Sequence, residues 1–372
     1  MTGELGPRVP KRVLHIGKYF PPHRGGMETV LRDQMNMQTR DEGLQVAAVV
    51  HSSERRLTDK VELHPLGYRV RHAARWLTAV FAPIAPFFAW SVYREIKKLD
   101  PDEIRVHMPN VSAFWLLCLP AAWRRSWTIL WHSDVLPSEH SVGLRVFYWA
   151  YRPFESVLLR LSDKIIATSP PYLAASATLR RFREKCIVEP LKLDRRRIAT
   201  CKLRATETRD TADSSLKVLC VGRLTYYKNF TAAVRAIAAI PGAELRIVGD
   251  GEKRLEIINL IKDLDVSERV SLMTNVRDSE LWGHYQWCDL HCLPSNERTE
   301  AFGLSITEAG LFGKPSVVYD VVGSGVAWNA MQSSPDSEIA RAINVPELGQ
   351  AILRCAQKTG AGQFIRDKSS TR

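Results

Sequence analysis

The chain has 372 residues and a formal net charge of +12 at pH 7, from 52 Lys and Arg against 40 Asp and Glu. Its length excludes a single core of ordinary size and suits two domains. The 45% of hydrophobic and 25% of charged residues are typical of a soluble globular protein. The excess of positive charge predicts an anionic partner: a nucleic acid, a phosphorylated small molecule or an anionic membrane surface.

The seven cysteines are scattered, and several stand in apolar, strand-like runs. This pattern predicts reduced, buried thiols of a cytosolic protein instead of a disulfide framework. Cys288, His291 and Cys292 are close in sequence, but they fall in an expected buried strand and no second ligand pair follows. No metal site is therefore expected.

The ends and the apolar runs give no sign of an integral membrane protein. Residues 1–10 lack the apolar core of a signal peptide. The run 76–92 is at the lower length limit for a membrane span, and Pro83 and Pro86 interrupt it. We therefore interpret it as a loop followed by a helix over 87–99.

Two stretches begin alike, with a short strand, a glycine turn and a helix. The first has a strand over 12–16 and a helix from about Met27, and the second has a strand over 216–221 and a helix over 230–240. Strands and helices then alternate, which predicts a parallel sheet with right-handed crossovers. The further expected strands are 244–248, 269–273, 289–293 and 316–319, and the further expected helices are 252–264, 279–287, 303–312 and 347–357.

We therefore expect an α/β protein of two Rossmann-like domains. The expected divisions are an N-terminal domain over 1–194, a polar linker over 195–215, a C-terminal domain over 216–345, and a helix with a short polar tail over 346–372. A ligand in a cleft between such domains would lie outside the carboxyl ends of the strands.

The strongest chemical signal is a pair of glutamates, Glu300 and Glu308, around Phe302, Gly303 and Leu304. A helix expected from Gly303 would expose backbone N–H groups at its N-terminus, where phosphate binds well. Glu300 can accept hydrogen bonds from sugar hydroxyls, and Glu308 can reach a ribose. From the spacing alone, both glutamates are equally well explained by favourable electrostatics in the first turns of a helix.

The N-terminal half offers weaker candidates. Gly25 and Gly26 on their own indicate only a turn before a helix. His132 follows the apolar strand 127–130 and therefore lies at its carboxyl end, and His107 is similarly placed at the end of another strand. A lone histidine in such a place is more often structural, and for His107 the structural and functional interpretations stay balanced.

The motif Glu300-x7-Glu308 with an internal Phe-Gly-Leu resembles the signature of family 4, the large GT-B family of retaining glycosyltransferases. The similarity extends over roughly residues 13–322. The resemblance implies that Arg223 and Lys228 bind the diphosphate of a nucleotide-sugar donor. Two cations suit that task because negative charge develops on the leaving diphosphate.

The resemblance also implies roles for other residues of both halves. Glu300 and His132 become the catalytic candidates, and Gly25 and Gly26 close over the donor phosphates, while the backbone at Val276 contacts the nucleobase. The implied donor-binding set is completed by Phe302, Gly303, Leu304 and Glu308. Family enzymes need no metal or other cofactor, and an oxygen of the leaving diphosphate helps to deprotonate the acceptor.

The implied reaction is hexose transfer to a glycan or lipid-linked acceptor in cell-surface polysaccharide or lipopolysaccharide synthesis. Mannose from GDP-mannose is favoured, with a UDP-sugar close behind. The implied location is the cytoplasm, with peripheral association at the anionic inner face of the cytoplasmic membrane. Basic and aromatic stretches at 69–76, 121–127 and 145–152 are candidates for lipid contact. The alternative is aromatics in the core and solvated arginines. No nucleic-acid-binding motif accompanies them, so no nucleic acid partner is expected.

The sequence departs from the family pattern at two places. Lys192 stands where a glycine is usual before the linker, and the tail 358–372 lacks the usual aromatic-rich segment. Two alternatives therefore stay open. One is a catalytically impaired or regulatory GT-B homologue with a shortened C-terminus, and the other is a different GT-B nucleotide-sugar enzyme.

Overall fold

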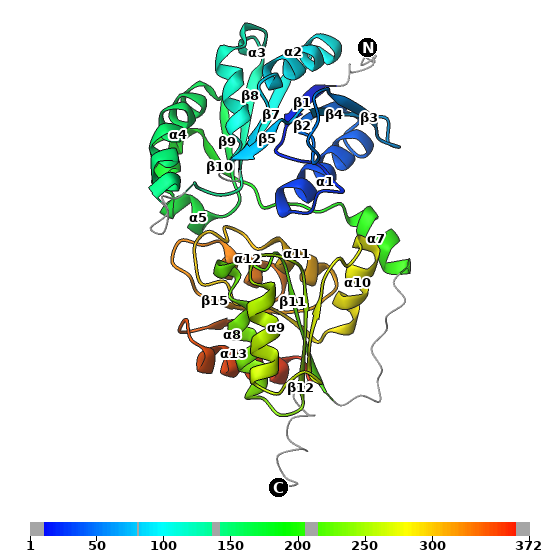
Figure 1. The fold of residues 1–372 in the computed structure, drawn as a ribbon, viewed down its shortest axis with the longest axis vertical. Coiled ribbons are helices and arrows are strands. Elements are labelled where there is room, and N and C mark those ends of the chain that lie inside the picture. The colour runs from blue at the N-terminus through cyan, green and yellow to red at the C-terminus, as the bar shows by residue number, and fades with distance from the viewer. Residues whose placement is uncertain (1–10, 80–81, 136–141, 205–214, 362–372) are drawn as a thin grey trace, which may run out of the picture. The chain divides into compact units, whose positions relative to one another are not determined.

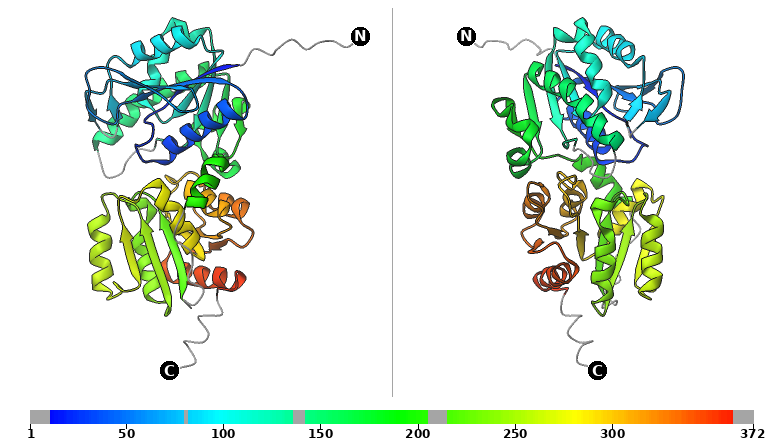
Figure 2. Two further views of the ribbon diagram at one scale, coloured as in Figure 1. Left: turned by 90° about the vertical axis from the view of Figure 1, so that its right-hand side faces the viewer. Right: turned by 60° about the vertical axis from the view of Figure 1, so that its left-hand side comes forward.

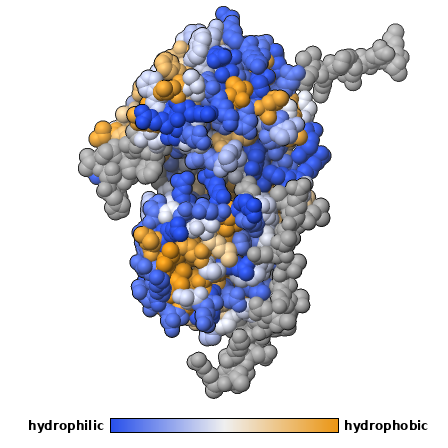
Figure 3. Space-filling model, turned by 45° about the vertical axis from the view of Figure 1, so that its right-hand side comes forward, coloured by the Kyte–Doolittle hydropathy of each residue, from blue (hydrophilic) through white to orange (hydrophobic). Residues whose placement is uncertain are grey.

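The computed structural model describes residues 11–79, 82–135, 142–204 and 215–361 (Figure 1). Its contacts divide the chain into two α/β units. The first unit comprises Met1–Thr168 and Ser176–Asp194, and the second comprises Ser169–Ala175 and Arg195–Arg372. Figure 2 shows helices on both sides of the sheet of the second unit. On the face drawn in Figure 3, hydrophobic residues form separate patches among hydrophilic ones.

The first unit is built on an eight-stranded sheet of order β10-β9-β8-β7-β1-β2-β4-β3, in which only β3 runs antiparallel to its neighbour. Its strands are β1 (Arg12–Ile16), β2 (Gln45–His51), β3 (Lys60–Leu63), β4 (Arg69–Ala73), β7 (Glu103–Met108), β8 (Ser126–Trp131), β9 (Lys164–Ala167) and β10 (Cys186–Val188), with a separate hairpin of β5 (Leu77–Ala79) and β6 (Ala82–Ile84). Its helices are α1 (Gly26–Arg40), α2 (Phe88–Leu99), η1 (Val111–Cys118), α3 (Pro120–Trp123), α4 (Val142–Leu161), α6 (Ala177–Arg180) and η2 (Arg183–Lys185).

The second unit has a parallel sheet of order β13-β12-β11-β14-β15-β16. Its strands are β11 (Leu216–Val221), β12 (Ala243–Val248), β13 (Val270–Met273), β14 (Leu290–Leu293), β15 (Ser316–Tyr319) and β16 (Glu338–Ala340). Its helices are α5 (Pro170–Ala175), α7 (Arg195–Arg204), η3 (Tyr226–Lys228), α8 (Phe230–Ala238), α9 (Arg254–Asp263), α10 (Asp278–Trp287), α11 (Leu304–Leu311), α12 (Val326–Ser333) and α13 (Val345–Lys358). The strand order reverses between β11 and β14, and such a switch point is where open α/β sheets bind ligands.

The segment 169–175, which contains α5, packs into the second unit although the chain then returns to the first. The guanidinium of Arg298 lies 4.7 Å from the ring centre of Tyr172. A Cβ added at Gly325 would lie 2.3 Å from Oγ of Ser169. The second unit is therefore assembled from two separate stretches of the sequence.

Every strand and helix expected from the sequence is present, with ends moved by no more than two residues. In the second unit the structure adds α12 and β16, which lie in a stretch rich in glycine and serine, and in the first unit it adds the strands β2, β3, β4, β9 and β10 and the helix α4. It also adds α7 within the expected linker 195–215, whose residues 205–214 lie outside the described part. The charge-dense α7 packs on α10, where Arg197 lies 5.3 Å from the ring centre of Trp282.

The apolar run 76–92 forms the β5–β6 hairpin and the start of α2, so the loop expected there is partly paired. Within the described residues, no helix is long and apolar enough to cross a membrane.

The expectation of buried thiols is wrong for Cys118, which is exposed at the end of η1, and Cys186 is only half-buried. The other cysteines with described side chains are buried and free: Cys220, Cys288, Cys292 and Cys355. Among the residues described, no three His, Cys, Asp or Glu side chains are grouped as a metal would need.

The loops that follow β11 and β12 pack backbone against backbone. The N–H of Gly222 donates to the carbonyl of Val248 at 3.0 Å. A Cβ added at Gly249 would lie only 1.9 Å from the carbonyl oxygen of Gly222. Glycine at position 249 therefore allows the loop after β11, which carries Arg223 and Lys228, to keep its course.

We predict that Gly249→Ala lowers the free energy of unfolding by about 2–4 kcal/mol, because backbone must move to admit the methyl group. Chemical denaturation measures the change. Gly349→Ala in α13 is the matched control, since a Cβ there meets nothing within 4 Å. This control should gain up to about 1 kcal/mol of stability from better helix propensity. Wild-type stability of Gly249→Ala would contradict the close approach.

Candidate functional site

The second unit brings Lys228 and Glu300 together at the switch point between β11 and β14. Lys228 ends η3 in the loop after β11, and Glu300 lies in the loop after β14. Nζ of Lys228 and Oε2 of Glu300 are 2.8 Å apart, with side chains 11% and 12% exposed. Opposite charges held largely out of water attract strongly, and each becomes costly to bury if the other is lost. The pair is therefore a polar site at the ligand-binding edge of the sheet.

The two expected diphosphate-binding cations have different surroundings. A Cβ added at Gly222 would lie 3.1 Å from Cε and Nζ of Lys228, so the lysine side chain lies against this glycine. Arg223, the next residue, is exposed. Lys228 is therefore already positioned by an ion pair, whereas Arg223 reaches outward from the same loop.

A residue of α12 fixes the backbone at the start of α11. Gly303 precedes the helix with a φ of 75°, and a Cβ there would lie 2.9 Å from the side chain of Leu293. Nδ2 of Asn329 donates to the carbonyls of Phe302 at 2.9 Å and Gly303 at 3.1 Å. Phe302 is buried, so it contributes to the core and only its backbone is available to a ligand. Sequence reasoning missed Asn329 because it did not expect α12.

A second loop fixes the backbone around Glu300. Oγ of Ser324 donates to the carbonyl of Glu300 at 2.6 Å, and the N–H of Gly325 donates to the carbonyl of Ala301 at 2.9 Å. The carboxylate of Glu300 therefore projects from a backbone that is bonded on both sides of the turn.

Glu308 is buried on α11, where the hydroxyl of Tyr285 donates to its Oε2 at 2.7 Å. Burial raises the pKa of Tyr285 well above its usual range, and the nearby Glu308 adds to this shift. Val276 is half-buried in the loop after β13. Because the strands are parallel, this loop lies at the same edge of the sheet as the loops of Lys228 and Glu300.

In the first unit, Gly25 and Gly26 open α1. Gly25 is the residue before the helix and Gly26 is its first residue. A Cβ added at Gly25 would lie 2.1 Å from Oε2 of Glu28, so the carboxylate folds back onto this glycine. Sequence reasoning did not single out Glu28, which is buried and acidic beside the expected phosphate loop.

His132 and His107 are joined in a chain of buried side chains that also includes His15. Nε2 of His132 lies 3.0 Å from Nδ1 of His107, and Nε2 of His107 lies 3.1 Å from Nδ1 of His15. Burial lowers the pKa of His15 and of His132 to about 4, and that of His107 well below 6.5. All three rings are therefore neutral at pH 7. The signal for His15 was a polar residue inside the apolar strand 12–16.

A hollow opens beside His132 at the carboxyl ends of β8 and β9. Its lining includes Gln38 of α1, Thr168 after β9 and Lys192. Lys192, where the sequence departs from the family glycine, has a side chain 69% exposed and lies 3.6 Å from Glu189. A long cation therefore reaches solvent at this rim.

The prediction that the stretch 69–76 forms an exposed cationic patch for lipid contact is wrong. Arg71 is buried between Glu95 at 2.8 Å and Asp59 at 3.2 Å, and Arg69 also pairs with Glu95 at 3.2 Å. These arginines are occupied inside the unit because β4 packs against α2. In 121–127, Arg125 pairs with Asp100, whereas Trp123 and Arg124 are exposed. In 145–152, Arg145 and Trp149 of α4 are also exposed.

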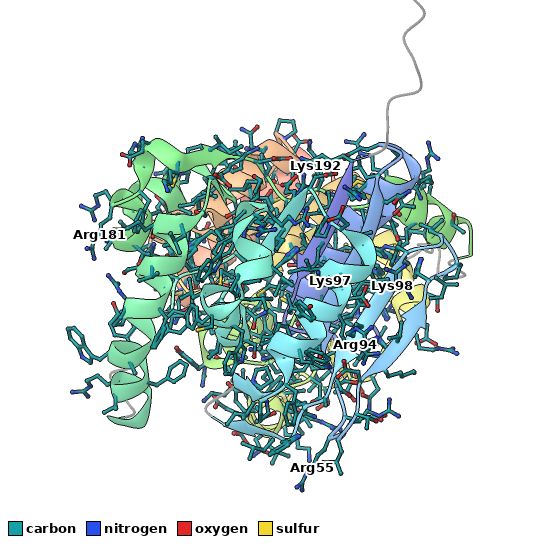
Figure 4. All side chains as sticks on the ribbon, turned by 90° about the horizontal axis from the view of Figure 1, so that it is seen from above. Arg55, Arg94, Lys97, Lys98, Arg181 and Lys192 are labelled. Atoms are coloured by element: carbon teal, nitrogen blue, oxygen red, sulfur yellow. The ribbon has the colours of Figure 1, made fainter. Side chains whose placement is uncertain are left out.

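A different basic and aromatic surface lies on α2, and we call it the α2 surface. Phe87 and Trp90 are 56% and 57% exposed. Arg94, Lys97 and Lys98 follow them along the same helix and are exposed, as Figure 4 shows. The adjoining hollow is lined in part by the apolar side chains of Leu57, Val61, Phe87 and Trp90. The sequence predicts the helix over 87–99 but does not show which of its side chains are exposed, so this surface was not predicted.

Comparison with known proteins gives consistent matches to both halves. Residues 206–328 match a family profile described as glycosyl transferases group 1, and residues 24–188 match one described as glycosyltransferase family 4. The chain is 26% identical over 320 residues to O-antigen chain mannosyltransferase C of Escherichia coli, covering 85% of this chain and 81% of that protein. It is 27% identical over 324 residues to D-rhamnosyltransferase WbpZ of Pseudomonas aeruginosa, covering 85% and 79%.

Solved structures are similar over nearly the whole chain. Sucrose-phosphate synthase from Thermosynechococcus elongatus matches with a TM-score of 0.72 at 19% identity, covering 95% of this chain and 92% of that one. Anabaena Alr3699/HepE in complex with UDP and glucose matches with a TM-score of 0.64 at 19% identity, covering 97% and 99%. At these identities the likeness establishes the fold.

Proposed function

Because the chain belongs to family 4 of the glycosyltransferases and has the GT-B fold, we propose that it moves a hexose from a nucleotide diphosphate sugar with retention of configuration. Mannose from GDP-mannose is the proposed donor, since one relative is named as an O-antigen mannosyltransferase. The proposed acceptor is a glycan or a lipid-linked glycan of cell-surface polysaccharide synthesis. The ion pair of Lys228 and Glu300 at the switch point carries the proposal.

In the proposed reaction, a bond forms between the acceptor oxygen and the anomeric carbon while the bond from that carbon to the diphosphate breaks. The acceptor proton passes to an oxygen of the leaving diphosphate. Lys228 and Arg223 neutralise the charge that develops there, assisted by the N–H groups at the start of α11. Glu300 accepts hydrogen bonds from sugar hydroxyls. No metal takes part in this proposal.

The remaining proposed roles follow the loops at the strand ends. The backbone at Val276 contacts the nucleobase, and Glu308, oriented by Tyr285, contacts the ribose. In the first unit, Gly25 and Gly26 approach the phosphates, and His132 contacts a sugar hydroxyl. These assignments give each loop one part of the donor or acceptor to bind.

We predict that Arg223→Ala and Lys228→Ala each weaken GDP binding by about 1.5–3 kcal/mol, the value of a charge-assisted hydrogen bond. Guanosine binding should hardly change. Calorimetry on the matched ligands measures both, after a thermal-shift screen of GDP, UDP and ADP has identified the preferred nucleotide. The exposed Lys262 of α9, replaced by Ala, is the control. Equal losses for nucleotide and nucleoside would show that the two residues support only the fold.

We predict that Glu300→Ala abolishes transfer while the protein stays folded. The carboxylate contacts the sugar in the proposal, and its loss also releases Lys228 from the ion pair. Turnover of the donor and the thermal midpoint should both be measured, with the exposed Glu268→Ala as control. Near-normal turnover of Glu300→Ala would remove Glu300 from the mechanism.

We also propose peripheral binding to anionic membrane through the α2 surface. Trp90 and Phe87 place large rings at the surface beside three cations, the combination that suits the headgroup region of a bilayer. Each cation near an anionic bilayer contributes about 1 kcal/mol, and this attraction is screened by salt. Such binding would bring the enzyme to a lipid-linked acceptor.

The vesicle experiment compares paired charge reversals on the first unit. Lys97→Glu with Lys98→Glu should lower binding to anionic vesicles at least tenfold at low salt. Reversal of the exposed pair Arg181 and Arg183 should have little effect. Arg181 lies apart from α2 in Figure 4. Sedimentation with vesicles of neutral and anionic lipid measures binding. Equal losses of vesicle binding for the two charge-reversal pairs would show that net charge, and not the α2 surface, governs the binding.

A further inference from the structure

Four buried side chains of the first unit form one continuous hydrogen-bond chain. Gln38 of α1 lies with Oε1 2.8 Å from Nε2 of His15. His15 continues to His107 at 3.1 Å, and His107 continues to His132 at 3.0 Å. The four residues are 2%, 0%, 1% and 8% exposed in this order. This hydrogen-bond chain thus runs from α1 across the sheet of the first unit.

The strand register explains why the rings meet. β1, β7 and β8 are neighbours in the sheet, and His15 is paired with Arg105 while His107 is paired with Leu130. His107 stands two residues beyond Arg105, and His132 stands two residues beyond Leu130. Because side chains alternate between faces with a period of two, each ring lies on the same face as its neighbour and one step nearer the carboxyl edge.

The hydrogen-bond chain determines which nitrogen of each histidine carries the proton. A neutral imidazole has one N–H donor and one acceptor nitrogen. The carbonyl oxygen of Gln38 can only accept, so His15 carries its proton on Nε2 and must accept at Nδ1. By the same step, His107 donates from Nε2 to His15, and His132 donates from Nε2 to His107. Nδ1 of His132 is then left as an acceptor, and no hydrogen bond reaches it from the part of the chain that the structure describes.

We propose that Gln38, acting through His15 and His107, is a positioning residue that fixes the tautomer of His132 and keeps its Nδ1 as an acceptor for a sugar hydroxyl. The choice of a sugar hydroxyl rests on the proposed function, whereas the proton order rests on the first unit alone. Rotation of the Gln38 amide would make it a donor and would reverse every step, so that Nδ1 of His132 would become a donor. The side chain of one helix residue therefore sets the polarity of a nitrogen three hydrogen bonds away.

The first test needs no variant. In the full-length protein labelled with 15N-histidine, at pH 7.5, His132 should show a protonated Nε2 and an unprotonated Nδ1. Coupling between the two nitrogens across the His132–His107 hydrogen bond should be detectable. A protonated Nδ1 on His132, or the absence of that coupling, would overturn the proton order. Neither result depends on the enzyme's activity.

The second test replaces the amide. Gln38→Met removes the acceptor at similar size, so the His132 resonances should shift towards a mixture of tautomers. The kcat for GDP-mannose turnover should fall about tenfold, roughly the value of one neutral hydrogen bond, with little change in KM. Gln34→Met is the matched control, because Gln34 lies one helical turn earlier and lines the same hollow, and its Oε1 has no hydrogen-bond partner among the described residues.

The outcomes separate the positioning role of Gln38 from the use of Nδ1 of His132 in transfer, and both from the proposed function. Unchanged His132 resonances in Gln38→Met, or equal changes in Gln34→Met, would overturn the positioning role. A changed tautomer with unchanged kcat would overturn the use of Nδ1 as an acceptor in transfer. If the wild type turns over no nucleotide sugar, the proposed function fails, and the resonances still decide whether Gln38 fixes the tautomer.

Discussion

The site residues of both units depend on the parallel direction of the strands. In a parallel sheet all carboxyl ends meet at one edge, so loops that are far apart in the sequence become neighbours there. Lys228 and Glu300 meet in this way across β11 and β14, although 72 residues separate them in the sequence. In the first unit the same geometry places His107 and His132 beside each other. Without the shared strand direction, neither the pair of Lys228 and Glu300 nor the pair of His107 and His132 would form.

The candidate site residues of the two units are buried in different charge states. The second unit keeps opposite charges on Lys228 and Glu300, and the Coulomb attraction offsets part of the lost hydration. The first unit buries His15 and His132 as neutral rings, because burial lowers their pKa values to about 4. A charged pair can exchange one partner for a ligand, whereas a neutral chain transmits only the direction of its hydrogen bonds. The charged pair of the second unit therefore suits the binding of an anion, and the neutral hydrogen-bond chain of the first unit suits the orientation of a hydroxyl.

Most strands and helices of the second unit were predictable from the sequence because apolar periodicity and glycine turns are local signals. In the first unit β2, β3, β4, β9, β10 and α4 were not predicted. The motif around Glu300 was also visible, and family resemblance directed attention to Lys228. Their ion pair was not predictable, since it depends on strand order. His15 and Asn329 were missed for a related reason: each acts on a partner brought close only by the fold. The stretch 69–76 misled because sequence shows positive charges but not the buried carboxylates of Glu95 and Asp59 that occupy them.

The placement of 169–175 has a consequence for how the protein is made. The ribosome delivers Tyr172 before any of 195–361 exists, so the part of the second unit against which this ring lies is not yet made. A fragment that starts at Arg195 lacks this segment altogether, and Arg298 loses the ring against which it lies. The second unit is thus completed by residues from the earlier half of the gene, and no single cut separates the two units intact.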